Sequence, residues 1–432
     1  MGKNEHFEIL IIGAGIAGLA AAKSCLEKQK HFHVLEANSK LGGILRNFKI
    51  NEFTFDHAVH LSFATENAVR KEFDKAPYHE LEPEARNIAD GLWFKHPIQN
   101  NLHPLNVAEK VECISKFLNR PDYDESSFKT WLISQYGDKI AQKYHIRYNQ
   151  KYWDTDLSSM STDWIKNRLR QPDFLEILEG TYQERASNDY YIQSMRYPDT
   201  GGYQAFIGPL INQVLPHSAL GDPVVKIFPS KKIVITKSGR QISYTTLIST
   251  IPLPLYCKLI EELPQGIADD CRKLKWTTVD LTSVAISYEM DFPLWFYIYD
   301  KDVFAARCHS PSKKSKNNAP EGCSSIQFEV YTSQKIEDFD KIEKTHSKQN
   351  QIDNAKNFLQ TQFGIHEGDI RFVDFRTLKF GNVIFQHDTS SSVENIRAWL
   401  SDRSIQTCGR FGEWAYLWSN QAFLSGLNAL SK

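Results

Sequence analysis

Residues 8–18, EILIIGAGIAG, decide the fold of this chain. The run of four apolar residues predicts a strand that is buried on both faces, as in a parallel sheet. Gly13, Gly15 and Gly18 follow in the spacing GxGxxG, and the next residues, LAAAKSCLEK, predict a helix. The first glycine permits a tight turn, the second lets backbone approach a pyrophosphate, and the third lets the helix pack closely on the strand. This order of elements predicts a Rossmann-type dinucleotide site.

An acidic residue and a second pair of glycines follow. Glu36 ends the apolar stretch 33–35, where a carboxylate can accept hydrogen bonds from the ribose hydroxyls of an adenosine. Gly42, Gly43 and Arg46 come soon after it. The combination resembles the extended motif of the flavoprotein superfamily that includes amine oxidases, protoporphyrinogen oxidases and UDP-galactopyranose mutases. The resemblance implies FAD as cofactor, with the glycine pair against it and Arg46 near a phosphate.

The C-terminal end of the chain carries a matching pattern. Residues 407–412, TCGRFG, predict a short strand running into glycines, and residues 420–430, NQAFLSGLNAL, have the apolar spacing of a helix. In the resembled superfamily such elements bring backbone N–H groups to the flavin, which implies cofactor contacts at Gly409 and Arg410. We therefore expect the two ends of the chain to meet at one FAD molecule.

Composition limits the classes of partner. The 51 basic and 52 acidic residues give a formal net charge of −1, so no broad positive field favours nucleic acid. No stretch approaches the roughly 18 apolar residues of a membrane-spanning helix. The seven cysteines are scattered without a Cys-x-x-Cys spacing, and His31 and His33, which alternate on a predicted strand, are interpreted as ordinary surface or core histidines. We expect a soluble cytoplasmic protein that binds a small molecule, without a membrane span and without a metal.

The remaining patterns predict an α/β fold with two insertions. We expect a Rossmann-type FAD-binding domain, of the glutathione-reductase type, made of residues 1–95, 190–258 and 400–432. Residues 96–189 are charged, aromatic and helical in period, and predict a helical subdomain. Residues 259–399 contain several strand-like runs and predict a mainly antiparallel, substrate-binding sheet with a covering helix.

Several segments resemble UDP-galactopyranose mutases more specifically. They are DHAVH at 56–60, WFKHPIQNN at 93–101, the run 149–170, FYIY at 296–299, AR at 306–307, and the tyrosine after GEW at 412–414. The resemblance implies catalytic roles for His60, Arg168 and Tyr416, and substrate contacts for Gln99, Arg170, Tyr297 and Arg307. A guanidinium suits a diphosphate because its planar fork binds two phosphate oxygens and stays charged.

Three positions depart from that pattern. Val59 stands where the mutases have glycine or alanine, and a β-branched residue limits the backbone there. Glu289 aligns with a second diphosphate arginine, and an anion would repel that group. Asn382 aligns with a family tyrosine.

Three functions are therefore weighed. The first is a nucleotide-sugar pyranose/furanose mutase that uses reduced FAD, with NAD(P)H or another reductant, in the metabolism of sugars or surface polysaccharides. The alternative is an FAD-dependent oxidoreductase, of the amine oxidase or protoporphyrinogen oxidase type, that removes hydride from a small substrate in an aromatic pocket. A flavin-bearing binding protein without turnover is the third.

Overall fold

The computed structural model describes residues 5–165, 172–186 and 194–431. Its N-terminal elements follow the order expected from the glycine motif: β1 (Glu5–Ile12), α1 (Ile16–Glu27) and β2 (Phe32–Glu36). β1 and β2 are paired in parallel, with Ile9 opposite Phe32. The last four residues of β1 are buried, as the apolar run predicts for a strand covered on both faces.

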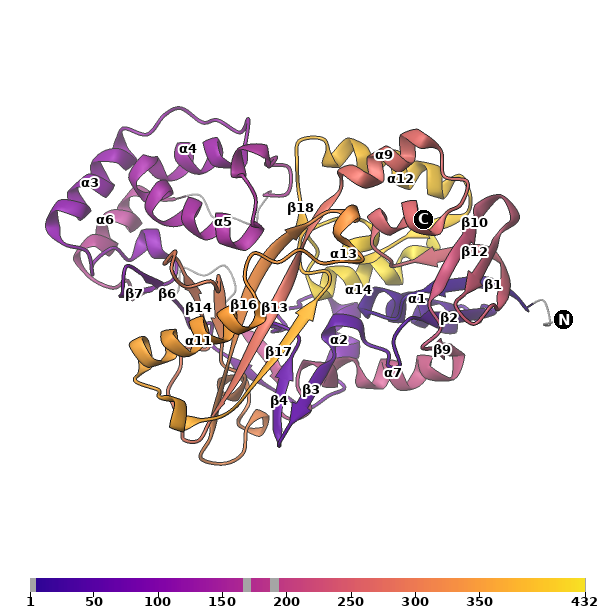
Figure 1. Cartoon of the computed structure of the whole chain (residues 1–432), viewed down its shortest axis with the longest axis horizontal. Helices are drawn as coiled ribbons and strands as arrows, with labels where there is room; N and C mark the ends of the chain where they lie inside the picture. Colours follow the sequence, from indigo (N-terminus) through magenta and orange to yellow (C-terminus); the bar gives the residue numbers. More distant parts are fainter. Residues whose placement is uncertain (1–4, 166–171, 187–193, 432) are drawn as a thin grey trace.

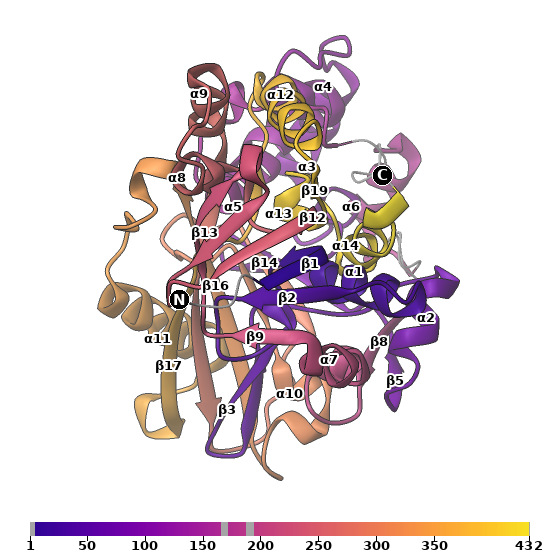
Figure 2. The same cartoon turned by 90° about the vertical axis from the view of Figure 1, so that its right-hand side faces the viewer.

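The first sheet has seven strands in the order β10-β11-β12-β1-β2-β9, with β19 paired to β12. Its later strands are β9 (Ser218–Leu220), β10 (Val224–Phe228), β11 (Ile233–Thr236), β12 (Gln241–Ser249) and β19 (Ile405–Thr407). β12 lies parallel to β1, and β19 lies parallel to β12. The C-terminal strand is therefore part of the same sheet as the N-terminal glycine motif, and Figures 1 and 2 show the two chain ends gathered on it.

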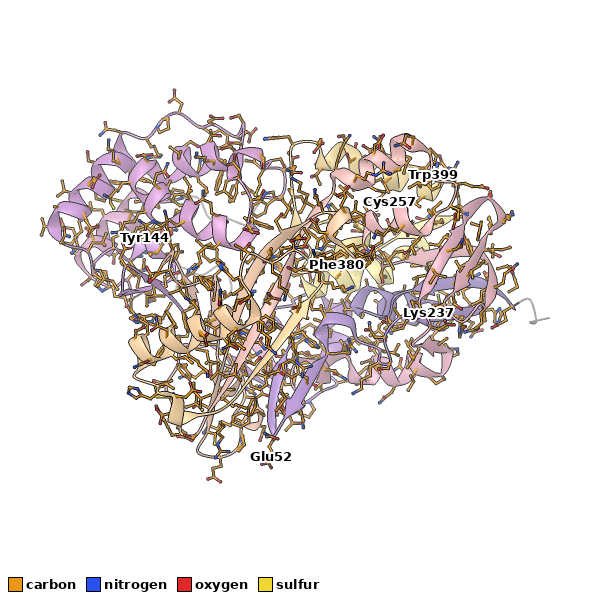
Figure 3. All side chains as sticks on the ribbon, in the orientation of Figure 1. Glu52, Tyr144, Lys237, Cys257, Phe380 and Trp399 are labelled. Atoms are coloured by element: carbon orange, nitrogen blue, oxygen red, sulfur yellow. The ribbon has the colours of Figure 1, made fainter. Side chains whose placement is uncertain are left out.

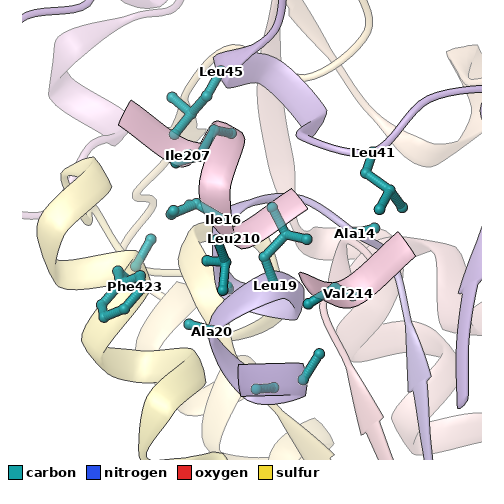
Figure 4. Close-up of a cluster of buried hydrophobic side chains, with 14 of the residues drawn as sticks. Ala14, Ile16, Leu19, Ala20, Leu41, Leu45, Ile207, Leu210, Val214 and Phe423 are labelled. Atoms are coloured by element: carbon teal, nitrogen blue, oxygen red, sulfur yellow. The ribbon is translucent and has the colours of Figure 1, made fainter. Parts of the chain in front are cut away.

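Helices cover this sheet. α1 packs beside α14 (Ser419–Leu427), and Figure 2 shows the two helices side by side. α7 (Gly208–Val214) also packs on α1, α12 (Thr389–Ser401) packs on β19, and α2 (Asn67–Phe73) contacts α14. Figure 4 shows the apolar cluster that joins the glycine loop to these helices, formed by Ala14, Ile16, Leu19, Ala20, Leu41, Leu45, Ile207, Leu210, Val214 and Phe423.

Close backbone contacts fix the meeting of the two chain ends. A Cβ atom on Gly426 would lie 2.0 Å from the carbonyl oxygen of Ala17, and one on Gly409 would lie 2.6 Å from the Cβ of Ala17. The main chain of Cys408 donates to the Ser249 carbonyl at 3.0 Å. These contacts confirm that the N-terminal glycines and the 409–412 turn belong to one region of the fold.

The second sheet has eight strands and is mainly antiparallel, as expected. Its order is β17-β13-β16-β15-β14-β6-β7, with β18 on β13, and only the β14–β6 pair is parallel. Its strands are β6 (Ala85–Ala89), β7 (Leu92–Lys95), β13 (Lys275–Ile286), β14 (Trp295–Ile298), β15 (Arg307–His309), β16 (Ser324–Gln334), β17 (Ile370–Leu378) and β18 (Val383–Ile384). α11 (Lys348–Phe363) contacts β13 and β17, and is the covering helix.

The helical part lies beyond this sheet, at the far end from β1 in Figure 1. It consists of α3 (Val107–Leu118), α4 (Phe128–Ile140), α5 (Arg147–Trp153) and α6 (Phe174–Tyr182). Figure 3 places Tyr144 among these helices and Lys237, in the turn after β11, on the opposite side of the molecule. No helix in the described ranges is long and apolar enough to cross a membrane.

The remaining elements connect these parts. Two antiparallel pairs form small sheets of their own: β3 (Asn47–Ile50) with β4 (Phe53–Asp56), and β5 (Tyr78–Leu81) with β8 (Met195–Pro198). The short helices are α8 (Tyr256–Leu259), α9 (Gln265–Lys273), α10 (Pro311–Lys314) and α13 (Gly409–Gly412).

Some segments cross the boundaries proposed from the sequence. β6 and β7 fall within residues 1–95 yet are strands of the second sheet. α12 begins within 259–399 and ends at Ser401, yet it packs on β19 of the first sheet. The division into three domains stays a proposal.

The contact between α14 and α1 can be tested at Gly426. Alanine normally stabilises a helix relative to glycine by roughly 0.5–1 kcal/mol. Here the added methyl would collide with the backbone of Ala17, so we expect Gly426→Ala to lower the free energy of unfolding by about 2 kcal/mol. Urea denaturation measures the difference. Gly368→Ala is the control, since a Cβ there meets nothing within 4 Å. A Gly426→Ala protein as stable as the wild type would contradict the packing.

Candidate functional site

The glycine loops form a backbone surface at the end of β1. Gly15 is the N-cap of α1, where no side chain caps the helix. The Gly42 N–H donates to the carbonyl of Ala14 at 2.8 Å, and a Cβ on Gly43 would lie only 2.8 Å from the Cα of Gly15. The two glycine segments therefore touch each other, and only glycine fits at the contact. The uncapped N–H groups of α1 favour a phosphate.

Glu36 lies beside this loop and is buried. Its Oε2 accepts from the main-chain N–H of Ala14 at 2.8 Å, and its Oε1 accepts from the main chain and side chain of Asn38 at 2.8 and 2.7 Å. A carboxylate held this way suits ribose hydroxyls. Arg46 is half-buried, and its Nε donates to the Gly43 carbonyl at 3.0 Å. These residues fit the adenosine and pyrophosphate of a dinucleotide, a part that FAD and NAD have in common.

The DHAVH segment is anchored by a buried ion pair. Asp56 binds the Lys314 ammonium at 2.5 Å, and both side chains are buried. Asp56 also accepts from the Tyr197 hydroxyl at 2.7 Å and from the Tyr203 main chain at 2.9 Å. Burial alone would raise the pKa of Asp56, but the Lys314 charge outweighs it and lowers the pKa. This network joins the start of the segment to α10 and to the turn at residues 201–203.

His60 lies at the end of the same segment. Its ring is 5.3 Å from that of Tyr203, and its Nδ1 is 3.3 Å from the Ala58 carbonyl. Burial lowers the pKa of His60 to about 4, so the ring is neutral at pH 7. Ala58, at φ +72°, is the residue that adopts the left-handed conformation, and Val59 does not. The β-branched Val59 therefore causes no strain in this segment.

Glu329 connects the His60 segment to Arg307. Its side chain is 0% exposed, and it accepts from the Val59 N–H at 2.9 Å. It also accepts from Arg307 Nη2 at 2.6 Å and from the Tyr331 hydroxyl. Burial favours a raised pKa for Glu329, but the Arg307 guanidinium outweighs burial and holds the pKa well below its usual range. Glu329 is thus ionised and balances the charge of Arg307.

A second cluster surrounds Tyr416, the last of the expected site residues. The Tyr416 hydroxyl lies 3.2 Å from that of Tyr152, and its ring lies 4.6 Å below the guanidinium of Arg410. Arg410 Nη2 donates to Asn382 Oδ1 at 2.7 Å. The Tyr152 ring also packs against that of Tyr331, with ring centres 4.6 Å apart and the planes tilted by 53°. The Arg410 and Arg307 clusters are therefore contiguous through the aromatic rings of Tyr152 and Tyr331.

The other expected substrate residues lie around these clusters or outside the described residues. Tyr297 is opposite Arg307 in the β14–β15 register, and its ring is 5.4 Å from that of Tyr148. Gln99 is 6% exposed, in the 3₁₀ turn Ile98–Asn100 that contacts α6. Arg168 and Arg170 lie outside the described residues.

Glu289 does not stand beside these arginines. β13 faces Glu329 at Leu281 and ends at Ile286, five residues and about 17 Å further along. Glu289 follows that end and is exposed. The alignment of Glu289 with the second diphosphate arginine of the mutases stays a prediction.

Sequence reasoning missed the residues that hold the site together. Asp56 was quoted only as part of the DHAVH motif, while Lys314, Glu329 and Tyr152 carried no assigned role. A carboxylate within the apolar strand 324–334 was the available signal, since an isolated charge on a buried strand needs a partner.

Comparison with known proteins agrees with this architecture. Residues 11–76 match the NAD(P)-binding Rossmann-like domain family. The crystal structure of reduced UDP-galactopyranose mutase is similar over 98% of this chain and 95% of that chain, with a TM-score of 0.89 and 23% identity. A putative protoporphyrinogen oxidase from Exiguobacterium sp. 255-15 matches over the full length of both chains, with a TM-score of 0.73 and 15% identity. Cyclohexylamine oxidase from Brevibacterium oxydans IH-35A matches over 98% of both chains, with a TM-score of 0.69 and 15% identity.

These similarities confirm the fold class. The chain combines a Rossmann-type dinucleotide-binding part with inserted helices and a second sheet. It has the fold of UDP-galactopyranose mutase, which putative protoporphyrinogen oxidase and amine oxidase chains share more distantly.

The Glu329–Arg307 pair gives a stability prediction. Glu329→Gln leaves the half-buried guanidinium of Arg307 without its counter-charge, which costs about 3 kcal/mol. We expect that loss in urea denaturation. In the double variant Arg307→Met, Glu329→Gln, no unbalanced charge remains, so a large part of the loss should be recovered. A single variant as stable as the wild type would refute the charge balance.

Four histidines with a lowered pKa give a pH prediction. Burial lowers the pKa of His60, His96 and His309 to about 4 and that of His145 to about 3. The unfolded chain takes up these protons near pH 6.5, whereas the folded chain does not. Stability therefore falls as pH falls from 7 towards 4, by about 1 kcal/mol per histidine between pH 7 and 5.5.

The measurement is urea denaturation at pH 7 and 5.5. His145 packs on Tyr136, with ring centres 3.9 Å apart, and its Nε2 is buried without a partner. The variant His145→Phe should lose less stability on acidification than the wild type. Equal stability of the wild type at both pH values would show that the histidines are not protected from protonation.

Proposed function

We propose that this chain is an FAD-dependent enzyme that acts on a nucleotide sugar, as a pyranose/furanose mutase that uses reduced FAD. The observation that carries the proposal is the cluster of Arg410, Tyr416 and Tyr152, contiguous with Arg307. Guanidinium groups and phenolic hydroxyls together bind the oxygens of a diphosphate. Arg168 and Arg170 are proposed to add to this set.

The balance of charge favours an anionic substrate. Glu329 neutralises Arg307, whereas Arg410 forms no ion pair within the described ranges. The cluster therefore carries net positive charge. A protonated amine would be repelled there, while a phosphate would be attracted.

The similarity in shape supports the same choice. The TM-score with reduced UDP-galactopyranose mutase is 0.89, against 0.73 and 0.69 with the two oxidases described above. The higher agreement extends over 98% of this chain, so it includes the helical part and the second sheet as well as the Rossmann part.

Each residue has a proposed role in this reaction. Reduced FAD, when bound, would supply a nucleophile for the anomeric carbon as the nucleotide leaves, so that a sugar ring could change size without net redox change. The adenosine and pyrophosphate of the cofactor would be held by Gly13, Gly15, Gly18, Glu36, Gly42, Gly43 and Arg46. Gly409 would contact the flavin half. His60, neutral at pH 7, presents an uncharged ring beside the flavin. Tyr416 and Arg307 bind the diphosphate, and Gln99 and Tyr297 line the sugar side.

The test is an assay on the purified protein reduced with dithionite or NAD(P)H. Incubation with UDP-galactopyranose and other nucleotide sugars should give furanose products only when the flavin is reduced. Tyr416→Phe should raise KM with a smaller effect on kcat, because a phosphate contact is made in the ground state as well. Glu289→Gln is the matched control and should leave both constants unchanged, since Glu289 is exposed beyond the end of β13.

A second candidate is an FAD-dependent oxidoreductase. The observation in its favour is the set of packed tyrosines Tyr148, Tyr152, Tyr297 and Tyr299, whose rings could shape an apolar pocket. Hydrogen peroxide released from an amine or a cyclic precursor, with no conversion of any nucleotide sugar by the reduced protein, would support this candidate and contradict the mutase.

A further inference from the structure

Lys151 joins the helical part of the molecule to the second sheet. It lies in α5, and its Nζ donates to the main-chain carbonyls of Ile298 and Asp300, both at 2.9 Å. Ile298 is the last residue of β14, and Asp300 follows two residues later. The Lys151 amine therefore holds the backbone on both sides of Tyr299.

Neighbouring strands hold the N–H groups of the same segment. The Ile298 N–H donates to the Ala306 carbonyl at 2.9 Å, and the Tyr299 N–H donates to the Ile88 carbonyl at 2.9 Å. Lys151 approaches from α5 and binds carbonyls instead. The helix is therefore attached to the end of β14 through the backbone, at two points that flank Tyr299.

Desolvation of the Lys151 amine costs free energy. Removal of the amine from water lowers the pKa of Lys151 to about 7, and the nearby Asp300 charge offsets this effect only in part. The Asp300 carboxylate itself accepts from the main-chain N–H of Asp90. Both acceptors of the amine are uncharged carbonyls, and an amine that has lost its proton still has two N–H groups for them. The contact therefore depends on the donors of the side chain rather than on its charge.

The Lys151 contact lies beside tyrosines of the proposed substrate site. α5 carries Tyr148, while Tyr297 lies on β14 and Tyr299 directly follows that strand. The ring centre of Tyr148 is 5.4 Å from that of Tyr297 and 5.4 Å from that of Tyr299. Lys151 comes three residues after Tyr148, so both side chains reach the end of β14 from one face of α5. Lys151 thus fixes the backbone of the segment whose rings pack on Tyr148.

We propose that Lys151 is a positioning residue for the substrate site: by holding the end of β14 on α5, it sets the place of Tyr297 relative to Tyr148. The inference rests on the proposed function, because that function assigns Tyr297 to the sugar side of the substrate. Tyr297 comes from the second sheet and Tyr148 from the helical part, so the space between their rings depends on how these two parts are joined. Loss of the contact would misorient the sugar without removing any group that touches it.

The test is Lys151→Met, which keeps the length of the side chain and removes its donors. With the reduced protein and UDP-galactopyranose, kcat/KM should fall about tenfold, because a small displacement misorients the reacting sugar. Isothermal titration with UDP, which lacks the galactose, should show an affinity unchanged within about twofold. Lys232→Met is the matched control. The Lys232 amine donates to the Thr245 carbonyl at 3.1 Å and to the Ser404 hydroxyl at 3.0 Å in the first sheet, so its loss should leave kcat/KM unchanged.

A double variant separates positioning from a general loss of structure. If Lys151 acts through Tyr297, Lys151→Met should lower kcat/KM by less than about threefold in a Tyr297→Phe background, because the group that it positions is already lost. Lys151→Arg should recover most of the activity, since a guanidinium also donates to two carbonyls. If Lys151→Met does not fold, Lys151→Gln replaces it with the same expectations, because its side chain is shorter.

The outcomes distinguish this inference from the proposed function. Full activity of a folded Lys151→Met protein would overturn the inference alone, and so would losses that add in the double variant. A UDP affinity that falls in parallel with kcat/KM would also overturn it, because the whole site would then have changed. A wild-type protein that converts no nucleotide sugar in the reduced state would contradict the proposed function, and the inference would fail with it.

Discussion

The architecture depends on contacts between bare backbone segments that side chains would prevent. A Cβ on Gly18 would lie 1.9 Å from the carbonyl of Gly13, one on Gly43 would lie 2.8 Å from Gly15, and one on Gly426 would lie 2.0 Å from Ala17. The first contact sets α1 on β1, the second joins the two glycine loops, and the third brings the C-terminal helix onto α1. Segments from both ends of the chain thus form one surface, on which the rest of the molecule is assembled.

A second constraint organises the region proposed for substrate. Glu329, on β16, is ionised and buried, and it binds both the Val59 main chain and Arg307. The same carboxylate therefore positions the segment that ends at His60 and the guanidinium of Arg307. Asp56 and Lys314 hold the other end of that segment. Buried ion pairs add little net stability, so we interpret these two as devices that fix geometry between parts of the chain that are distant in sequence.

The sequence alone could predict the parts of the fold that depend on local pattern. Residue type nearly determines the geometry of three short motifs. They are GAGIAG with its flanking strand and helix, the acidic Glu36, and the glycines near residue 409. Long-range pairing was harder to predict. The boundary at residue 95 divided strands that belong to the second sheet, because nothing local in residues 85–95 shows that β6 pairs with β14.

The candidate site divides in the same way. Residues that belong to short motifs could be named from the sequence, as were His60, Arg307 and Tyr416. In the structure, Glu329 links the His60 segment to Arg307, and Tyr416 lies in the adjoining cluster. The partners of these residues could not be named from the sequence, because Glu329 and Asn382 make their contacts with residues that are far away in the chain. Glu289 is exposed beyond the end of β13, and its exposure could not be foreseen from an alignment of short motifs.

The most direct measurement is the stoichiometry and identity of the bound nucleotide in the purified chain. Denaturation of the purified protein, followed by chromatography and mass analysis of the released ligand, should yield FAD at about one molecule per chain. Protein that has been freed of its ligand should bind FAD again. A protein that contains no flavin and shows no binding of FAD on titration would contradict the claim that the two ends of the chain form a flavin site.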